Sequence, residues 1–194
     1  PCQHGFVVAD VTGKGVPASL LMATMRATLR ANIQNNPNDI VQALRQVNGD
    51  IYRDSPVDKF ITSIYCNLDY ESHELSYVNS GHNPPYIVRA NDNRIEELDQ
   101  GGVMLGIMEE IDLPKATLSI DKGDILMLFS DGVTEATNPS GELFSEERFE
   151  QWLLDHNQLS AEEMKDALLK TLRDYADGSP QSDDITFIIV KRTN

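Results

Sequence analysis

The chain has 194 residues, which suits one compact domain, and its hydrophobic content of 40% is that of an ordinary folded protein. Acidic residues outnumber basic ones by 31 to 16, and the net charge of -15 argues against a nucleic-acid partner, whose phosphates it would repel. No run approaches the ~18 apolar residues of a membrane span. Cys2 and Cys66 are too few for a disulfide scaffold, and their spacing is not that of a metal site. We therefore expect a cytoplasmic domain.

The first predicted element is a buried strand that ends at Asp10 and is followed by the glycine-rich turn Gly13-Lys14-Gly15. Apolar residues on more than one face of the next segment predict a well-buried helix that begins near Pro17. Asn36-Pro37 is typical of a helix N-cap followed by proline, and it predicts the start of a second, amphipathic helix.

The middle of the chain changes to the two-residue period of strands. Alternation predicts an antiparallel hairpin of strands 60–68 and 75–79, followed by strands 86–89, 94–98 and 116–120. The segment 125–129 is apolar on both faces, which predicts a central covered strand, and it ends at Ser130-Asp131-Gly132.

Two helices and a strand complete the chain. Ser145 opens the first helix, and Ser160 with Glu163 forms a capping-box pattern for the second. The last strand, 185–190, is apolar on both faces and is entered through Asp183-Asp184. We find no linker or repeat and expect one domain, 1–194; because the sequence enters a strand almost at Pro1, we also expect it to be part of a longer protein.

Three buried-type strands thus carry aspartates at one end: Asp10, Asp131 and the pair Asp183-Asp184. If those ends meet, the carboxylates need a counter-charge, and no cluster of arginine or lysine in these motifs supplies one. Oxygen-only ligands favour magnesium, manganese or calcium over zinc. The alternative is that these are three separate turn aspartates, and spacing alone leaves both open.

Several motifs in this order carry a family resemblance. They are 10–15 (Asp-Val-Thr-Gly-Lys-Gly), 80–85 (Ser-Gly-His-Asn-Pro-Pro), Leu105-Gly106, 129–135 (Phe-Ser-Asp-Gly-Val-Thr-Glu) and 183–186 (Asp-Asp-Ile-Thr). Together they resemble the metal-dependent protein phosphatases (PPM) of the phosphatase-2C type, in the bacterial branch typified by SpoIIE and RsbU. The resemblance spans essentially the whole chain.

The resemblance implies an α+β fold: a four-layer α-β-β-α sandwich of two antiparallel sheets flanked by helix pairs, with two manganese or magnesium ions at one end. By position, Asp10 is similar to the metal-bridging aspartate and the Val11 carbonyl to a further ligand. Asp131 matches a later ligand, and Asp183 matches the last one better than Asp184 does. The implied activity is hydrolysis of phosphoserine or phosphothreonine by a metal-bound water, without a phosphoenzyme.

The same resemblance implies the setting of the enzyme. Typical substrates of this branch are phosphorylated anti-sigma-factor antagonists of the STAS type. The catalytic domain is usually the C-terminal output of a bacterial sensor, so the expected location is the cytoplasm or the cytoplasmic side of a membrane sensor. A homodimer is also possible in this branch.

Two departures from the family pattern affect the site. The family has another ligand aspartate on a strand before the first one here, within a Gly-Gly-Asp stretch, and we expect this sequence to lack that strand. Thr12 stands where eukaryotic relatives carry a histidine acid, so protonation of the leaving group has no assigned residue. We expect His82 to hydrogen-bond its own loop and leave it out of the catalytic set.

Two other functions stay open from the sequence. One is a phosphatase-like scaffold that has lost activity and binds a regulatory partner. The other is a structural domain in which calcium or magnesium stabilises the fold and has no catalytic role. Retention of Asp10, Asp131 and Asp183 favours the enzyme, since a scaffold needs none of them.

Overall fold

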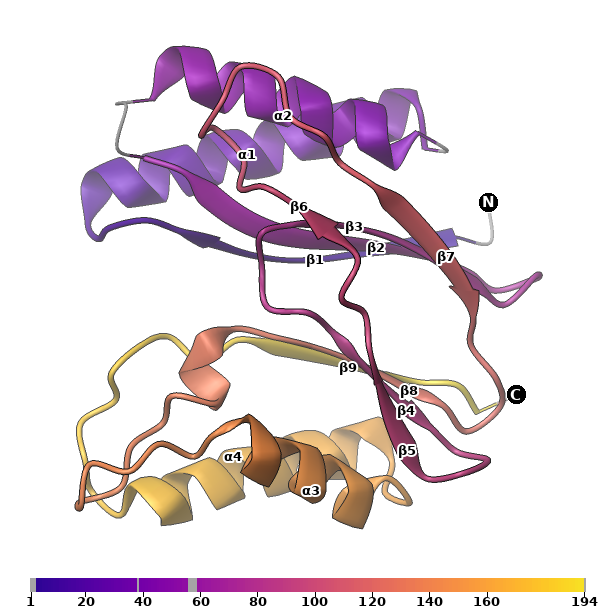
Figure 1. Cartoon of the computed structure of the whole chain (residues 1–194), viewed down its shortest axis with the longest axis vertical. Coiled ribbons are helices and arrows are strands. Elements are labelled where there is room, and N and C mark those ends of the chain that lie inside the picture. Colours follow the sequence, from indigo (N-terminus) through magenta and orange to yellow (C-terminus); the bar gives the residue numbers. More distant parts are fainter. Residues whose placement is uncertain (1–2, 38, 56–58, 194) are drawn as a thin grey trace. The chain divides into compact units, whose positions relative to one another are not determined.

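The computed structural model describes residues 3–37, 39–55 and 59–193 (Figure 1). The chain divides into two compact units, which are described separately below. Unit 1 comprises Pro1–His82 with Gln100–Leu118, and unit 2 comprises Asn83–Asp99 with Ser119–Asn194. Cys2 lies outside the described residues.

Unit 1 is built on a sheet in which β1, β2 and β3 pair antiparallel in that order. The short β6 adds a parallel pair at the end of β3, and β7 also pairs with β3. The strands are β1 (Gln3–Val11), β2 (Ile61–Asp69), β3 (Glu74–Ser80), β6 (Gly101–Gly102) and β7 (Lys115–Ser119). The predicted hairpin of β2 and β3 is therefore confirmed.

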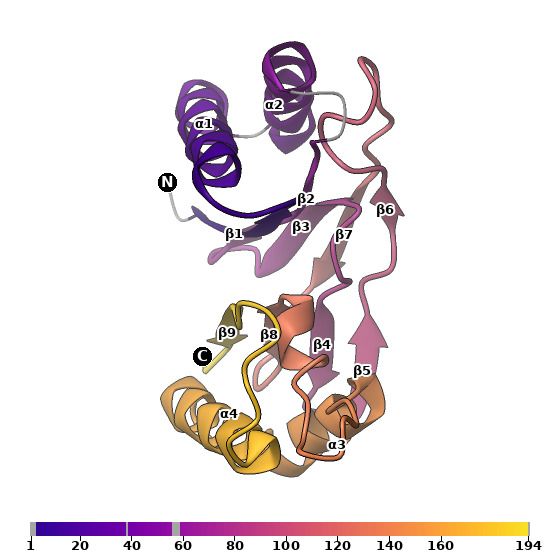
Figure 2. The ribbon, with the colours of Figure 1, turned by 90° about the vertical axis from the view of Figure 1, so that its left-hand side faces the viewer.

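Helices α1 (Val16–Asn35) and α2 (Ile40–Asp54) lie side by side on one face of this sheet (Figure 2). The start of α2 differs from the sequence prediction, because Asp39 is the N-cap rather than Asn36. The Asp39 carboxylate accepts a hydrogen bond from the backbone N–H of Gln42 at 2.9 Å. A carboxylate one residue before the helix satisfies an otherwise unpaired N–H, so the helix begins there.

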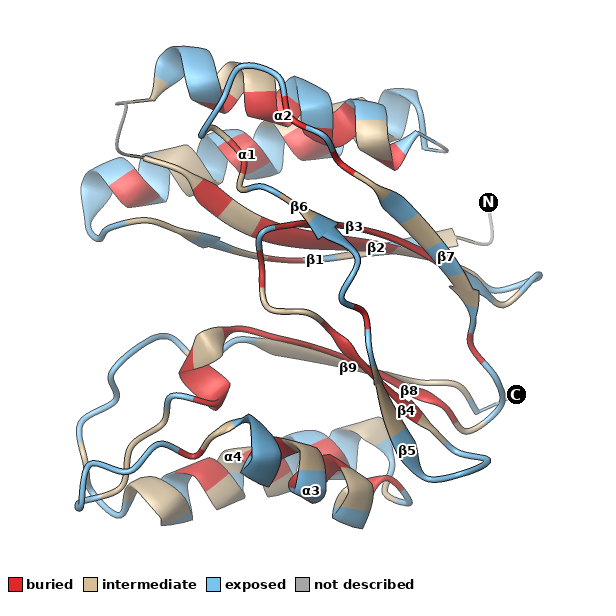
Figure 3. Cartoon of the chain, viewed as in Figure 1, coloured by how far each residue is buried: buried red, intermediate tan, exposed pale blue. Residues whose placement is uncertain are grey.

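The prediction that the first helix is well buried is wrong for α1. Only Ala18, Met25 and Leu29 are buried, whereas Val16 is 72% and Leu20 is 64% exposed. Much of α1 is coloured as exposed in Figure 3. One face of α1 packs on the core of unit 1, and the small alanines of the other face tolerate water. Apolar residues on several faces of a helix therefore did not indicate burial here.

Asn48 of α2 fixes the loop that follows β6. Its side chain is 1% exposed, donates to the carbonyls of Met108 and Glu109 at 3.0 Å, and accepts from the N–H of Gly106 at 2.8 Å. Gly106 has a φ of 87°, and a Cβ there would lie 2.4 Å from the Ile51 side chain. One buried amide thus satisfies three backbone groups of a loop that glycine alone can form.

Unit 2 is built on an antiparallel sheet of order β5-β4-β8-β9, with helices α3 and α4 on one face (Figures 1 and 2). The elements are β4 (Tyr86–Arg89), β5 (Arg94–Glu97), β8 (Ile125–Phe129), β9 (Phe187–Lys191), α3 (Glu146–His156) and α4 (Ala161–Ala176). The capping box of Ser160 and Glu163 is present at the start of α4, as predicted.

Strand β8 lies between β4 and β9 and is buried along its whole length, which confirms the predicted central strand. Phe129 at its end packs against Tyr86 and Phe149, with ring centroids 5.1 and 4.9 Å away. Strand β9 differs from the prediction, because its residues are only half-buried. Among the described strands it pairs with β8 alone, so none of them covers its other edge.

The predicted fold class is confirmed as α+β, with two largely antiparallel sheets and four helices among the described residues. In the same part of the chain, no helix combines the length and the apolar character that a membrane crossing requires.

We predict that Asn48→Ala lowers the free energy of unfolding by about 2–3 kcal/mol, because it leaves three backbone groups of the 106–109 loop without partners. Urea denaturation measures this change. Gln46→Ala, on the exposed side of the same helix, is the control and should change stability by no more than about 0.5 kcal/mol. Equal denaturation midpoints for the two variants would contradict the role given to Asn48.

Candidate functional site

Asp10 is the next-to-last residue of β1 and is exposed. Its neighbour across the ladder is Thr62 of β2, and Val11 is paired with Ile61. Thr12 continues this pairing, because its N–H and its hydroxyl both donate to the carbonyl of Phe60 at 3.1 Å. The Thr12 hydroxyl also accepts a hydrogen bond from the Phe60 N–H at 3.0 Å, so Thr12 holds the end of β1 against Phe60.

The turn after Thr12 requires glycine. Gly13 has a φ of 90°, and a Cβ there would lie 2.9 Å from the Lys59 ammonium. Gly15 has a φ of 78° and is the residue before α1. Lys14 between them is exposed. The chain therefore leaves β1 directly beyond Asp10 and turns into α1 within four residues.

His82 contributes more to unit 1 than the sequence indicated. Its backbone N–H and carbonyl are both held by the Asn79 side chain, at 2.8 and 2.9 Å, which confirms the expected bonding within its own loop. Its ring Nδ1 also lies 3.0 Å from the Thr62 hydroxyl. Because Thr62 lies directly opposite Asp10, the side chains of these two residues share one face of the sheet. The ring of His82 thus reaches the residue beside Asp10.

Asp131 follows β8 in unit 2 and begins the 3₁₀ helix η1 (Asp131–Val133). Its backbone carbonyl accepts from the Glu135 N–H at 2.8 Å and from the Thr134 hydroxyl at 3.2 Å. Its half-buried carboxylate forms no hydrogen bond or ion pair with the residues that the structure describes. Hydrogen bonds therefore fix the backbone of Asp131, whereas its carboxylate stays available to bind a ligand.

Asp183 and Asp184 lie in the exposed segment before β9. The Asp183 carboxylate accepts from the Asp184 N–H at 2.7 Å, and its carbonyl accepts from the Gln181 side chain, also at 2.7 Å. The Asp184 carboxylate has no hydrogen-bond or ion-pair partner among the described residues. One carboxylate oxygen of Asp183 is thus used in a hydrogen bond within the segment, whereas neither carboxylate oxygen of Asp184 has a partner among the described residues.

Unit 2 brings the Asp131 and Asp183-Asp184 segments together. The buried Ser130 hydroxyl donates to the Asp184 carbonyl at 2.9 Å and accepts from the Thr186 N–H at 3.0 Å. The Ser130 N–H donates to the Thr186 carbonyl at 2.9 Å. A Cβ at Gly132 would lie 2.3 Å from the Asp184 carbonyl oxygen, so only glycine permits this approach. Ser130 stands in a sequence motif, but nothing in the sequence indicates that it joins the two segments.

The donor chemistry of these residues fits a hard divalent cation, because carboxylate and carbonyl oxygens are what magnesium and manganese bind. Across residues 3–37, 39–55 and 59–193, no three His, Cys, Asp or Glu side chains gather as a metal-binding group. Cys66 is not a candidate ligand, since it is fully buried and burial raises the pKa of its thiol.

The family model for stage II sporulation protein E (SpoIIE) matches residues 3–193. The chain belongs to the SpoIIE family. The phosphoserine phosphatase RsbU of Bacillus subtilis is 32% identical over 191 residues, which cover 96% of this chain and 55% of that protein. Protein IcfG of Synechocystis is 31% identical, with 96% of this chain and 33% of that protein covered. This member of the SpoIIE family thus spans about half or less of the length of these relatives.

Solved structures show the same fold. The SiaA-PP2C domain of Pseudomonas aeruginosa gives a TM-score of 0.83 at 21% identity. The matched region covers 96% of this chain and 75% of the chain in that structure. The PP2C phosphatase domain of SpoIIE from Bacillus subtilis gives a TM-score of 0.77 at 18% identity, with coverages of 97% and 54%. The resemblance to the bacterial phosphatase-2C branch that the motifs predicted is confirmed.

We predict that Ser130→Ala lowers the free energy of unfolding by about 1–2 kcal/mol, because it removes a buried hydroxyl that donates to the Asp184 carbonyl and accepts from the Thr186 N–H. Chemical denaturation measures the change. Ser140→Ala, at an exposed turn of the same unit, is the matched control and should stay within about 0.5 kcal/mol of wild type. If both serine variants unfold like wild type, the proposed link between the two segments is wrong.

Proposed function

We propose that this chain is the catalytic part of a protein serine/threonine phosphatase that uses manganese or magnesium. The observation that carries the proposal is the joining of the Asp131 and Asp183-Asp184 segments by Ser130 in a chain of the SpoIIE family. Two relatives, RsbU and RsbP of Bacillus subtilis, are named phosphoserine phosphatases, which supports phosphoserine as the group hydrolysed.

The residues proposed to hold the cations are those that match the family motifs. They are Asp10, the Val11 carbonyl, Asp131 and Asp183, with Asp184 as the alternative to Asp183. Bound divalent cations would supply Lewis-acid activation of water and neutralise charge on the phosphoryl group. Of the two acidic residues in the last segment, Asp184 has the freer carboxylate, because one oxygen of Asp183 already accepts a backbone N–H.

The chain's own residues would orient this chemistry. Ser130 and Gly132 hold the backbone on which the Asp131 and Asp184 carboxylates stand. Thr12 is not a suitable acid for the leaving group, because its hydroxyl is engaged with the Phe60 backbone and is a poor acid at neutral pH. The proposed protein substrate is a phosphorylated anti-sigma-factor antagonist of the STAS type, as in the branch that the motifs resemble.

We predict that the full-length protein hydrolyses a phosphoserine peptide with manganese, and that Asp131→Asn lowers kcat/KM at least about 100-fold, since it removes a ligand of the activating cation. Phosphate release measures the rate. Asp121→Asn, an exposed aspartate on the turn before β8, is the control and should keep wild-type activity. Chelation should abolish the activity, and added manganese should restore it.

The contrasting outcome distinguishes an enzyme from a scaffold. Wild-type protein that is inactive on every phosphoserine substrate tried, while still folded and loaded with manganese, would overturn the phosphatase proposal.

A further inference from the structure

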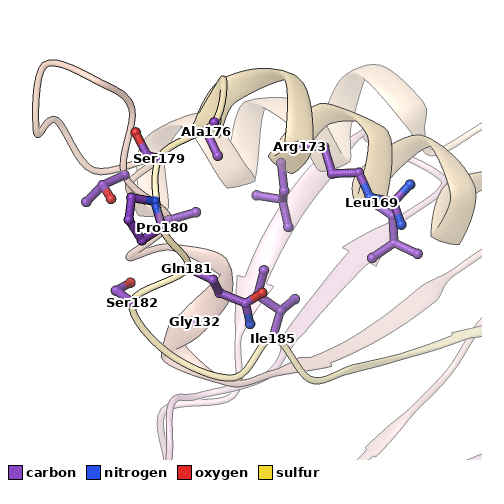
Figure 4. A pocket seen from close by; sticks show the side chains of 13 residues that line it. Gly132, Leu169, Arg173, Ala176, Ser179, Pro180, Gln181, Ser182 and Ile185 are labelled. Atoms are coloured by element: carbon purple, nitrogen blue, oxygen red, sulfur yellow. The ribbon is translucent and has the colours of Figure 1, made fainter.

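A pocket of about 550 Å³ lies within unit 2, between the C-terminal half of α4 and the loop that leads to β9 (Figure 4). Leu169 and Arg173 contribute to its wall from α4, and Pro180, Gln181 and Ile185 contribute from the loop. This volume falls in the range of ligand-binding pockets, about 300–1,000 Å³. Gly132 and Ile185 belong to the sequence motifs, whereas the lining residues of α4 do not.

The pocket adjoins the candidate site through the chain itself. Gly132, which lines it, directly follows Asp131, and Ile185 directly follows Asp184. A molecule that fills the pocket therefore lies next to the backbone that carries both carboxylates. The hydroxyl of Ser182 donates to the Glu135 carbonyl at 3.3 Å, which helps to fix the loop side of the wall.

The lining combines an apolar interior with one cation. Leu169, Leu172, Ala176, Pro180 and Ile185 supply apolar surface. Arg173 is the one charged side chain among the described residues that line the pocket. Its guanidinium forms no hydrogen bond or ion pair within the described part of the chain, although the protein carries a net charge of -15. A cation without a carboxylate partner in such an acidic protein is suited to an anion from outside.

We propose that this pocket binds the residues that flank the phosphoserine of the protein substrate, with an apolar side chain inside it and a carboxylate against Arg173. The inference rests on the proposed phosphatase function and adds the substrate preference. Arg173 is then a specificity residue: it contacts the substrate away from the phosphoryl group. Small phosphate esters, which lack flanking residues, do not use the pocket.

Two phosphoserine-like peptides test the inference in the full-length protein. Both carry a phosphonate analogue of phosphoserine that cannot be hydrolysed. In one peptide the analogue is followed by Leu-Asp-Asp, and in the other it is followed by Ala-Ala-Ala. Fluorescence anisotropy measures binding. We expect the Leu-Asp-Asp peptide to bind roughly tenfold more tightly, since burial of one leucine is sufficient for that ratio.

Variants assign the preference to the pocket. Arg173→Glu should reduce the tenfold ratio to about twofold or less by repelling the carboxylates, and Ala176→Phe should reduce it by filling the apolar space. Lys170→Glu is the matched control, because Lys170 lies on the same helix, is exposed and does not line the pocket. Circular dichroism confirms that each variant is folded.

The outcomes separate this inference from the proposed function. Equal binding of the two peptides by wild type, or a preference that both pocket variants keep, would overturn the pocket assignment. A preference lost in both pocket variants and kept in Lys170→Glu supports it. If that pattern appears but neither p-nitrophenyl phosphate nor a phosphopeptide is hydrolysed, the pocket stands as a phosphopeptide site and the phosphatase proposal fails.

Discussion

The hydroxyl of Ser130 is the contact on which the candidate site of unit 2 depends. It lies at the end of β8, and it bonds both the Asp184 carbonyl and the Thr186 N–H, in a segment more than fifty residues later in the chain. Gly132 allows the two backbones to approach, since any side chain there would collide with the Asp184 carbonyl. The bonds use backbone groups and leave the carboxylates of Asp131 and Asp184 without partners in the described chain. Carboxylates without internal partners can present both of their oxygens to a cation.

Hydrogen bonds also fix the segments around Asp10 in unit 1, and two elements of unit 2 form the walls of the pocket. In unit 1, Thr12 fastens the end of β1 to Phe60, and Thr62 and His82 are bonded to each other beside Asp10. In unit 2, the C-terminal half of α4 forms one wall of the pocket, and the loop that follows forms the other. Rigid strands and helices thus place the groups proposed for chemistry, and short loops present them. The proposed function follows from this arrangement together with membership of the SpoIIE family, whereas the proposed substrate preference follows from Arg173 and the apolar lining.

The sequence predicted the elements whose signals are local. Alternation located β2 and β3, the apolar run located β8, and Ser160 with Glu163 marked the start of α4.

Prediction from the sequence failed where a distant or competing contact decides the outcome. Asp39 rather than Asn36 caps α2, and the apolar Val16 and Leu20 of α1 are exposed. Asn48 and Ser130 look like ordinary polar residues in sequence, because their partners lie about 55 to 60 residues away. The motif aspartates were found from sequence; the serine that joins two of their segments, the histidine bond to Thr62 and the Arg173 pocket required the structure.

Manganese affinity is the most direct test of the central claim that the motif aspartates are cation ligands rather than separate turn residues. Electron paramagnetic resonance counts free manganese during titration of the full-length wild type, Asp10→Asn and Asp131→Asn, without reference to any substrate. We predict that each substitution weakens manganese binding at least about tenfold, since each removes an anionic oxygen ligand. Affinities that match the wild type in both variants would contradict it and would return these aspartates to the role of turn formers.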